Sequence, residues 1–245
     1  MEERDPPVRQ LSGVDEIDAA LDRGAAVELL LVGSGCTAPE LGALIARARS
    51  TGVRVRTVSA EVLRRMSRTD PPAEVLALVG RRPQATLDEL LAGPGAVWLL
   101  AGVAYPGNVG MAIRTAEVSG ASGIIVEAGF GRRERRFALR VSVRSDWYMP
   151  VLWEDARVAL EAARRHGRRI IGIEDVGQQA PWTTNLIGRV LLVVGGETRG
   201  IASELLSRCD ALVRIPMVGF IPSYNLQAAV AALATERLRQ LERLS

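Results

Sequence analysis

The residues best suited to chemistry are an amide and a guanidinium six positions apart, Asn108 and Arg114. They lie in the segment PGNVGMAIRTA, residues 106–116, where glycine and proline mark the corner between an apolar run and a helical pattern. This spacing could bring an amide and a permanently charged, phosphate-binding group to the same mouth of a sheet. The alternative is an Asn108 that caps the helix and an Arg114 that is solvated.

Two glycine-marked loops near the C-terminus are the second chemical feature. They read RVLLVVGGETRGI over residues 189–201 and IPMVGFIPSYNL over residues 215–226. Each follows an apolar, β-branched run typical of a buried strand, and each leads into a helix. Two such corners close together can form a small-molecule pocket at the edge of an α/β sheet.

Strand and helix patterns alternate through the region that must position these loops. The predicted strands are Val97–Val103, Gly123–Val126, Ile170–Ile173, Val190–Val194 and Leu212–Ile215. The predicted helices are Asn108–Ser119, Arg133–Val143, Asp155–Arg165, Ile201–Arg208 and Ser223–Leu244. This order predicts an α/β fold with a mostly parallel sheet and helices on both faces. The last helix has an apolar stripe that either packs on its own sheet or forms a dimer seam.

The N-terminal third reads as a separate, small α/β module. Residues 12–80 alternate helix and strand patterns, and breaker residues then cluster between residues 80 and 96. Thr86 followed by Glu89 suits a capping box, which predicts a short helix there. We therefore expect an N-terminal domain over 1–80, a linker over 81–95 and a second domain over 96–245.

A third glycine-containing loop, LLLVGSGCTA over residues 29–38, matches a relaxed dinucleotide-binding pattern. The next strand, however, ends in Thr57-Val58-Ser59 and lacks the acidic residue that would bind the ribose. The module is also too short for a complete dinucleotide fold. We therefore interpret Gly33 and Gly35 as a tight turn and disfavour a nucleotide-dependent oxidoreductase.

Composition narrows the chemistry further. All 31 basic residues of this 245-residue chain are arginine, so no lysine can form a Schiff base. His166 is the only histidine and lies at a predicted helix end, which disfavours a Ser-His-Asp triad and a histidine metal site. The two cysteines lack metal-binding spacing, so we expect no metal. The charged N-terminus and the absence of a 20-residue apolar run predict a soluble, cytoplasmic protein.

Three segments together resemble the SPOUT class of RNA methyltransferases, in the branch that methylates the ribose 2′-hydroxyl. The first motif, N-x-G-x-x-x-R-x-A, is present at residues 108–116. The second, a strand followed by G-x-E-x-x-G, is present at 195–200, and the third, I-P-M with a later S-x-N, at 215–217 and 223–225. Each motif alone is weak, but all three in order form a strong signal over residues 96–244.

This resemblance implies a C-terminal fold tied in a trefoil knot, S-adenosylmethionine as methyl donor, and a homodimer that completes the active site. The N-terminal module is similar, in position, size and alternation, to the ribosomal-protein-like RNA-binding domain attached to many such enzymes. The implied substrate is structured RNA, with large-subunit (23S) ribosomal RNA favoured and transfer RNA next. No membrane partner is implied.

The resemblance also assigns site residues. The expected donor-binding residues are Val194, Gly195, Gly196, Ile215, Met217, Tyr224 and Leu226. The expected catalytic residues are Asn108, Arg114, Glu197, Ser223 and Asn225. Because a guanidinium does not deprotonate readily, we expect Arg114 to orient the RNA rather than act as the base. Tyr224 departs from the family, which usually has leucine there, and Ser142-Val143-Arg144 replaces a common S-x-G turn.

An arginine-rich segment follows the first motif. As the face of a solvated helix it would be unremarkable, but beside an RNA enzyme's active site it is a candidate phosphate track. The expected RNA-binding residues are Arg132, Arg133, Arg135, Arg136, Arg140 and Arg144. A non-catalytic SPOUT protein that binds RNA or the methyl donor without turnover stays open as an alternative.

Overall fold

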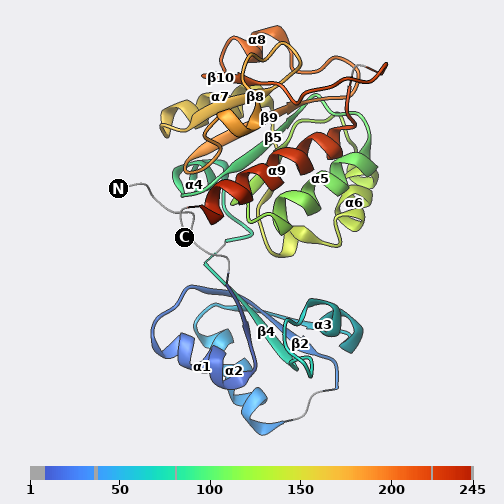
Figure 1. Ribbon diagram of the computed structural model, residues 1–245. Helices are drawn as coiled ribbons and strands as arrows, with labels where there is room; N and C mark the ends of the chain where they lie inside the picture. The colour runs from blue at the N-terminus through green and yellow to red at the C-terminus, as the bar shows by residue number, and fades with distance from the viewer. Residues whose placement is uncertain (1–8, 36–37, 81, 222, 244–245) are drawn as a thin grey trace. The chain divides into compact units, whose positions relative to one another are not determined.

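The chain forms two compact units, over residues 7–82 and residues 83–245 (Figure 1). The computed structural model describes residues 9–35, 38–80, 82–221 and 223–243. Cys36 and part of the 29–38 loop therefore lie outside the described residues.

The N-terminal unit is a four-stranded sheet in the order β1-β4-β2-β3. Strand β4 is antiparallel to both β1 and β2, whereas β2 and β3 are parallel. Helices α1 and α2 cover one face of this sheet, and their apolar residues meet those of β2 and β4 in a single core. The strands are β1 Arg9–Ser12, β2 Val27–Gly33, β3 Arg54–Val58 and β4 Val75–Val79, and the helices are α1 Val14–Asp22, α2 Pro39–Ser50 and α3 Ala60–Met66.

The C-terminal unit is built on a six-stranded, wholly parallel sheet in the order β10-β8-β9-β5-β6-β7. Its central strands are continuous apolar runs because both of their faces are buried. The strands are β5 Val97–Ala101, β6 Gly123–Val126, β7 Val151–Trp153, β8 Arg169–Ile173, β9 Val190–Gly195 and β10 Ala211–Val213. The helices are α4 Leu87–Ala92, α5 Pro106–Val118, α6 Arg132–Val141, α7 Ala156–Arg165, α8 Ser203–Leu206 and α9 Leu226–Glu242.

Helices cover both faces of this sheet, as the sequence predicts. One core joins α5, α6 and α9 to the sheet, and a second core on the opposite face joins α4, α7 and α8. In Figure 1, α9 (red) lies across β5 and β9 beside α5. Its predicted apolar stripe packs on its own sheet through Leu226, Val230, Leu233 and Ala234.

The short helix α4 is fixed at both ends. Thr86 and Glu89 form the expected capping box at its N-terminus. At the other end Arg168, which is only 3% exposed, donates hydrogen bonds to carbonyl oxygens of Leu90, Leu91, Gly93, Gly95 and Val190. This one guanidinium therefore joins the segment that precedes β5 to the adjacent strands β8 and β9.

Helices α5 and α6 approach each other closely at Gly110. A Cβ atom there would lie 2.5 Å from the carbonyl oxygen of Ala138 and 2.6 Å from Cβ of Val141. This close contact leaves no room for a side chain and so explains the glycine of the first motif. Helix α6 ends in a left-handed turn in which Val143 and Arg144 have φ values of 55° and 61°. Glycine would adopt these angles without strain, which explains the family's usual S-x-G turn at this position.

Candidate active site

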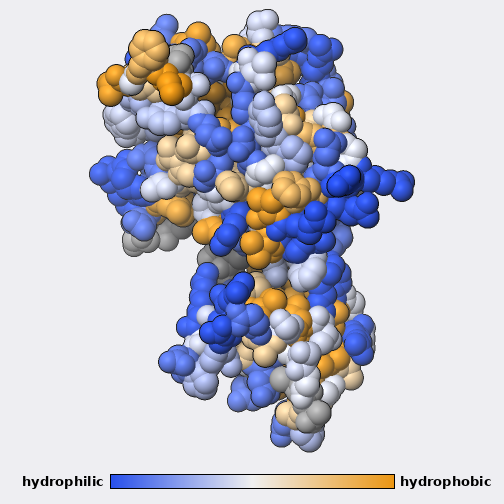
Figure 2. Space-filling model, turned by 90° about the vertical axis from the view of Figure 1, so that its right-hand side faces the viewer, coloured by the Kyte–Doolittle hydropathy of each residue, from blue (hydrophilic) through white to orange (hydrophobic). Residues whose placement is uncertain are grey.

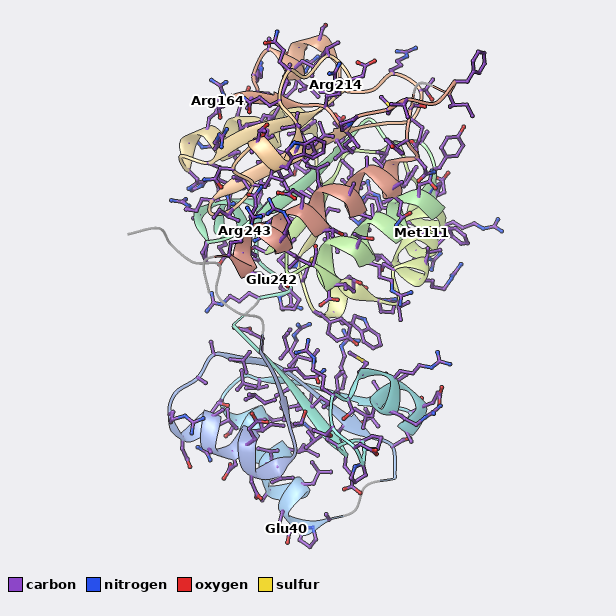
Figure 3. The ribbon with its side chains drawn as sticks, viewed as in Figure 1. Glu40, Met111, Arg164, Arg214, Glu242 and Arg243 are labelled. Carbon is purple, nitrogen blue, oxygen red and sulfur yellow. The ribbon has the colours of Figure 1, made fainter. Side chains whose placement is uncertain are left out.

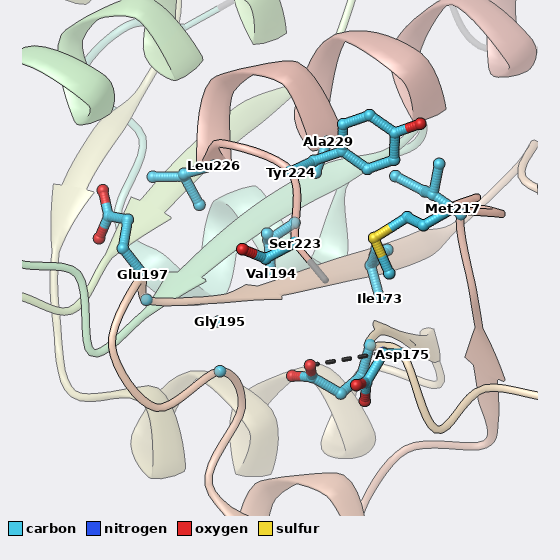
Figure 4. A pocket seen from close by; sticks show the side chains of 14 residues that line it. Ile173, Asp175, Val194, Gly195, Glu197, Met217, Ser223, Tyr224, Leu226 and Ala229 are labelled. Carbon is cyan, nitrogen blue, oxygen red and sulfur yellow. Dashed lines mark hydrogen bonds between the residues drawn. The ribbon is translucent and has the colours of Figure 1, made fainter. Parts of the chain in front are cut away.

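A pocket opens at the carboxyl ends of β8, β9 and β10, three neighbouring strands (Figure 4). The loops after these strands and the first turn of α9 form its walls. Such an edge is where open α/β sheets bind ligands. The lining residues are Ile173, Glu174, Asp175, Val194, Gly195, Gly196, Glu197, Gly200, Ile215, Met217, Ser223, Tyr224, Leu226 and Ala229.

The loop after β9 is compact because it contains glycines at its contact points. Gly200 donates its amide to the carbonyl of Gly196 at 2.9 Å, which folds the loop back on itself. A Cβ on Gly195 would overlap the backbone of Gly200 and Ile201. The glycines of the second motif thus let two backbone segments touch and leave the backbone open toward the pocket.

The first and second motifs meet through a side-chain hydrogen bond. Asn108 Nδ2, in the first turn of α5, donates to Glu197 Oε1 at 2.8 Å. Helix α5 begins at Pro106 with Tyr105 as its N-cap residue, so the prediction that Asn108 caps the helix is wrong. The pair connects residues 89 positions apart in sequence and places a polar, hydrogen-bonded carboxylate at the pocket wall.

The other expected catalytic residues occupy three different settings. Ser223 lines the pocket. Asn225 does not; its side chain caps α9 by accepting the amide of Gln227 at 2.9 Å, and so shapes the third loop. Arg114 is exposed on α5, about 9 Å along the helix axis from Asn108, and outside the pocket lining. The structure therefore brings Asn108 and Glu197 together but leaves Arg114 outside the pocket lining.

All seven expected donor-binding residues line the pocket. Val194, Ile215, Met217 and Leu226 supply apolar walls of the kind that an adenine ring occupies. Tyr224 is 51% exposed, and its hydroxyl donates to the carbonyl of Pro216 at 3.3 Å, so the ring stands at the pocket's edge. With the open glycine backbone opposite, these residues fit a methyl donor that has an apolar base and polar ends.

The expected RNA-binding arginines divide into two groups. Arg132, Arg133, Arg136 and Arg140 are exposed on α6. Arg135 instead donates to the carbonyl of Phe130 and lies over the Trp153 ring, and Arg144 pairs with Asp146 at 2.7 Å. Four of the six are therefore turned to solvent, while two contribute to local structure.

Sequence reasoning missed the loop after β8. Ile173, Glu174 and Asp175 line the pocket although no motif covers them. Only the strand order, which inserts β8 between β9 and β10, brings this loop to the other two. His166 is the C-cap residue of α7, as its position predicts, and its Nε2 lies 2.9 Å from Asp88 Oδ1.

The described residues lack two other features, a membrane-spanning helix and a metal site. None of their helices is both long and apolar enough to cross a bilayer. They also contain no group of three or more His, Cys, Asp or Glu side chains that could hold a metal ion.

Comparison with known proteins agrees with this geometry. The SpoU rRNA Methylase family model matches residues 96–235. The chain belongs to the SpoU rRNA methylase family. A second family model, described as RNA 2′-O ribose methyltransferase substrate binding, matches residues 11–85. The family membership thus covers both units of the chain.

Individual relatives give more detail. The 23S rRNA (adenosine(1067)-2′-O)-methyltransferase of Streptomyces laurentii is 30% identical over 218 residues, which are 88% of this chain and 81% of that protein. The 23S rRNA (guanosine-2′-O-)-methyltransferase RlmB of Xanthomonas axonopodis is 26% identical over 93% of this chain and 95% of its own. The AdoMet-bound rRNA methyltransferase of Sinorhizobium meliloti superposes with a TM-score of 0.59 at 26% identity, covering 96% of this chain and 88% of that one.

Proposed function

We infer that this SpoU-family chain transfers a methyl group from S-adenosylmethionine to a ribose 2′-hydroxyl of structured RNA, with 23S ribosomal RNA as the favoured substrate. The observation that carries this inference is the single pocket formed by the loops after β8, β9 and β10, with Glu197 in its wall bonded to Asn108. The names of the two relatives described above specify different nucleosides of 23S rRNA, adenosine and guanosine, and the same 2′-oxygen. What they share is the ribose hydroxyl, and this supports a ribose target while leaving the base open.

When bound, the donor supplies a methyl group on a positively charged sulfur, which needs little activation. The chain's own contribution is positioning. The apolar walls and the backbone around Gly195 would hold the adenine of the donor. Ser223 and Glu197 line the same pocket. In the proposed transfer a carbon–oxygen bond would form at the ribose, the methyl carbon–sulfur bond would break with its electron pair left on sulfur, and the hydroxyl proton would pass to solvent water. The Asn108–Glu197 hydrogen bond keeps the carboxylate in place during this step.

Arg114 is suited to binding RNA rather than to removing the proton. A guanidinium stays protonated at all physiological pH values, and its fork of donors matches a phosphate. In the described part of the chain no carboxylate pairs with Arg114. We therefore propose that Arg114 holds a phosphate next to the target ribose, and that the exposed arginines of α6 extend this positive track.

The decisive experiment is incubation with unmodified ribosomal RNA and methyl-labelled donor, followed by alkaline hydrolysis. Alkali cleaves RNA through the 2′-hydroxyl, so a methylated ribose leaves a resistant, labelled dinucleotide. We expect label in such dinucleotides, and mapping would then identify the nucleotide. Label confined to bases would refute the 2′-hydroxyl target. Donor binding without any transfer would favour the non-catalytic alternative, and transfer RNA in a parallel reaction tests the other substrate class.

We propose that the N-terminal unit selects the RNA. The substrate-binding family match over residues 11–85 supports this division of labour, with catalysis in the unit that contains residues 96–245. A ribosomal RNA substrate would place the enzyme in the cytoplasm. A chain that lacks residues 1–80 should keep donor binding but lose preference for ribosomal RNA over an unrelated transcript. Unchanged preference would contradict the proposal.

We also propose a homodimer formed through α5. Met111 and Val118, seven positions apart on one face of α5, are 52% and 74% exposed. Figure 3 labels Met111 on α5, and Figure 2 shows apolar side chains among charged ones on this unit's surface. Arg114 lies between these two residues on the same helix face. Because Arg114 lies outside the lining of its own pocket, we propose that in such a dimer it serves the partner protomer's pocket.

Mixed dimers test this arrangement. Arg114→Ala removes the proposed phosphate contact, and Met217→Arg blocks the donor pocket, so each homodimer should be nearly inactive. In a mixed dimer one protomer carries each substitution. If Arg114 acts across the interface, the Arg114→Ala protomer keeps an intact pocket and receives the intact arginine of its partner, so each mixed dimer should have about half the activity of the wild-type dimer. No recovery on mixing would show that Arg114 acts within its own protomer.

We further propose that the C-terminal unit contains the family's trefoil knot. The path of the chain supports this proposal. After edge strand β10 the chain passes along the pocket, and α9 then packs against α5.

A further inference from the structure

The pocket has a one-sided charge that the motifs do not explain. The chain has a net charge of +3 and 31 arginines. Yet every charged residue among the described residues that line the pocket is acidic: Glu174, Asp175 and Glu197. Glu197 belongs to the second motif and is bonded to Asn108. The other two carboxylates come from the loop after β8 and have no part in the function derived so far.

Glu174 is a fixed carboxylate with spare hydrogen-bonding capacity. Its Oε2 accepts the amide of Ile201 at 2.7 Å, which anchors it against the turn after β9. Its Oε1 accepts the amide of Asp175 only at 3.4 Å. A carboxylate can accept about four hydrogen bonds, so about half of this capacity is unused. Backbone contacts therefore hold the charge at the pocket wall, and no cation of the described residues pairs with it.

Asp175 adds a second negative charge beside the first. It is exposed, and its carboxylate makes no ion pair with any residue that the structure describes. Figure 4 shows Asp175 at the end of β8, on the side of the pocket opposite Tyr224. Two adjacent unpaired carboxylates create a negative potential in a concave site that focuses it.

We propose that Glu174 and Asp175 make this pocket select the positively charged methyl donor over its neutral-sulfur product. The inference rests on the proposed function, because it takes the pocket to be the donor's. S-adenosylmethionine carries a sulfonium, an ammonium and a carboxylate, for a net charge of +1. S-adenosylhomocysteine has lost the sulfonium charge and is net neutral. Acidic residues attract the first more than the second, so affinity falls as the methyl group leaves, which favours product release.

Charge-neutralising, shape-conserving substitutions separate this role from a structural one. In Glu174→Gln the amide oxygen can still accept the hydrogen bond of Ile201, so the turn is kept while the charge is lost. Asp175→Asn is nearly isosteric at an exposed position. Glu161→Gln is the matched control, because it removes one negative charge from the exposed side of α7 in the same unit.

The test is calorimetric binding of S-adenosylmethionine and S-adenosylhomocysteine to the full chain at low and high salt. Each pocket substitution should weaken donor binding about fivefold and product binding less than twofold, so the preference for the donor should fall by roughly 0.5–1 kcal/mol. High salt screens charges, so it should also reduce the preference of the wild type for the donor over the product. The control should leave both affinities unchanged.

Three outcomes would overturn the inference. Equal weakening of both ligands would make these residues positioning residues without charge selection. Unchanged affinities would remove them from recognition altogether. Failure of the wild type to bind either ligand would refute the donor pocket itself, and so would contradict the proposed function first. If Glu174→Gln fails to fold, the Asp175→Asn variant and the salt dependence carry the test.

Discussion

Replacing Arg168 with methionine should destabilise the C-terminal unit by about 3 kcal/mol. Arg168 is almost fully buried, and its guanidinium meets five backbone carbonyls and no carboxylate. Burial lowers the pKa of this group to about 10, so it remains a cation at neutral pH. Methionine fills a similar volume but donates no hydrogen bond, so the carbonyl oxygens at the end of α4 lose their partner.

The magnitude follows from two opposing terms. Removing one partner of a buried, hydrogen-bonded charge network destabilises a protein by about 3–5 kcal/mol. Methionine also removes the buried charge itself, whose desolvation is unfavourable, so we expect the lower end of this range, about 3 kcal/mol. Arg168→Lys should lose about half as much, because an ammonium has three donors and lacks the planar fork.

Tryptophan fluorescence reports on this unit alone. All four tryptophans of the chain lie beyond residue 83, so urea unfolding followed by their emission is insensitive to the N-terminal unit. With a slope near 2 kcal/mol per molar urea, the expected midpoint shift is about 1.5 M. Arg169→Met is the control, since the Arg169 side chain makes one hydrogen bond within the described residues, to the carbonyl of Asn185 at 3.1 Å. If both variants shift the midpoint equally, the buried network does not stabilise the unit as reasoned.

Three further perturbations have definite expected outcomes. Gly110→Ala should lower the unfolding free energy by about 1–2 kcal/mol, because the added Cβ meets the carbonyl of Ala138, and an unchanged midpoint would refute the close helix contact. Val143→Asn should stabilise by about 1 kcal/mol, because asparagine tolerates φ near 55° and the valine is largely exposed; a destabilised variant would argue against strain there. Burial raises the pKa of the Cys209 thiol to about 11, so its alkylation, measured by peptide mass spectrometry, should stay slow until the pH passes 10. Because the pKa of this thiol is higher in the folded state, its contribution to the free energy of unfolding is fully present below pH 9 and is lost as the pH rises toward 11. In Cys209→Ala the free energy of unfolding should therefore fall less over this pH range.

The alternation of the fold could be predicted because apolar runs and breakers coincide with element ends. Gly123–Val126 is both the predicted and the observed span of β6. The errors have physical causes. Helix α5 begins at Pro106, two residues before the predicted start, because proline suits the first turn although it reads as a breaker. Strand β1, Arg9–Ser12, lies outside the predicted elements because an edge strand with alternating polar residues has no apolar run.

The site could be predicted only where a motif marks it. The second and third motifs predict the expected donor-binding residues, and all of these residues line one pocket. The bond between Asn108 and Glu197 could not be predicted from spacing, because it depends on β5 and β9 being neighbours in the sheet. Glu174 and Asp175 have no motif at all. Their place follows from β8 entering the sheet between β9 and β10, a crossover that periodicity does not reveal.

The charge distribution fits the two different ligands that the proposed reaction needs. RNA is a polyanion and the donor is a cation, and both must lie side by side at one sheet edge. A basic donor pocket would bind phosphate in place of the donor, whereas an acidic one repels it. The proposed roles of the exposed arginines of α6 and of the carboxylates after β8 therefore agree, since each set would attract one ligand and repel the other. Neutralising Glu174 or Asp175 should consequently weaken donor binding more in the presence of RNA than in its absence.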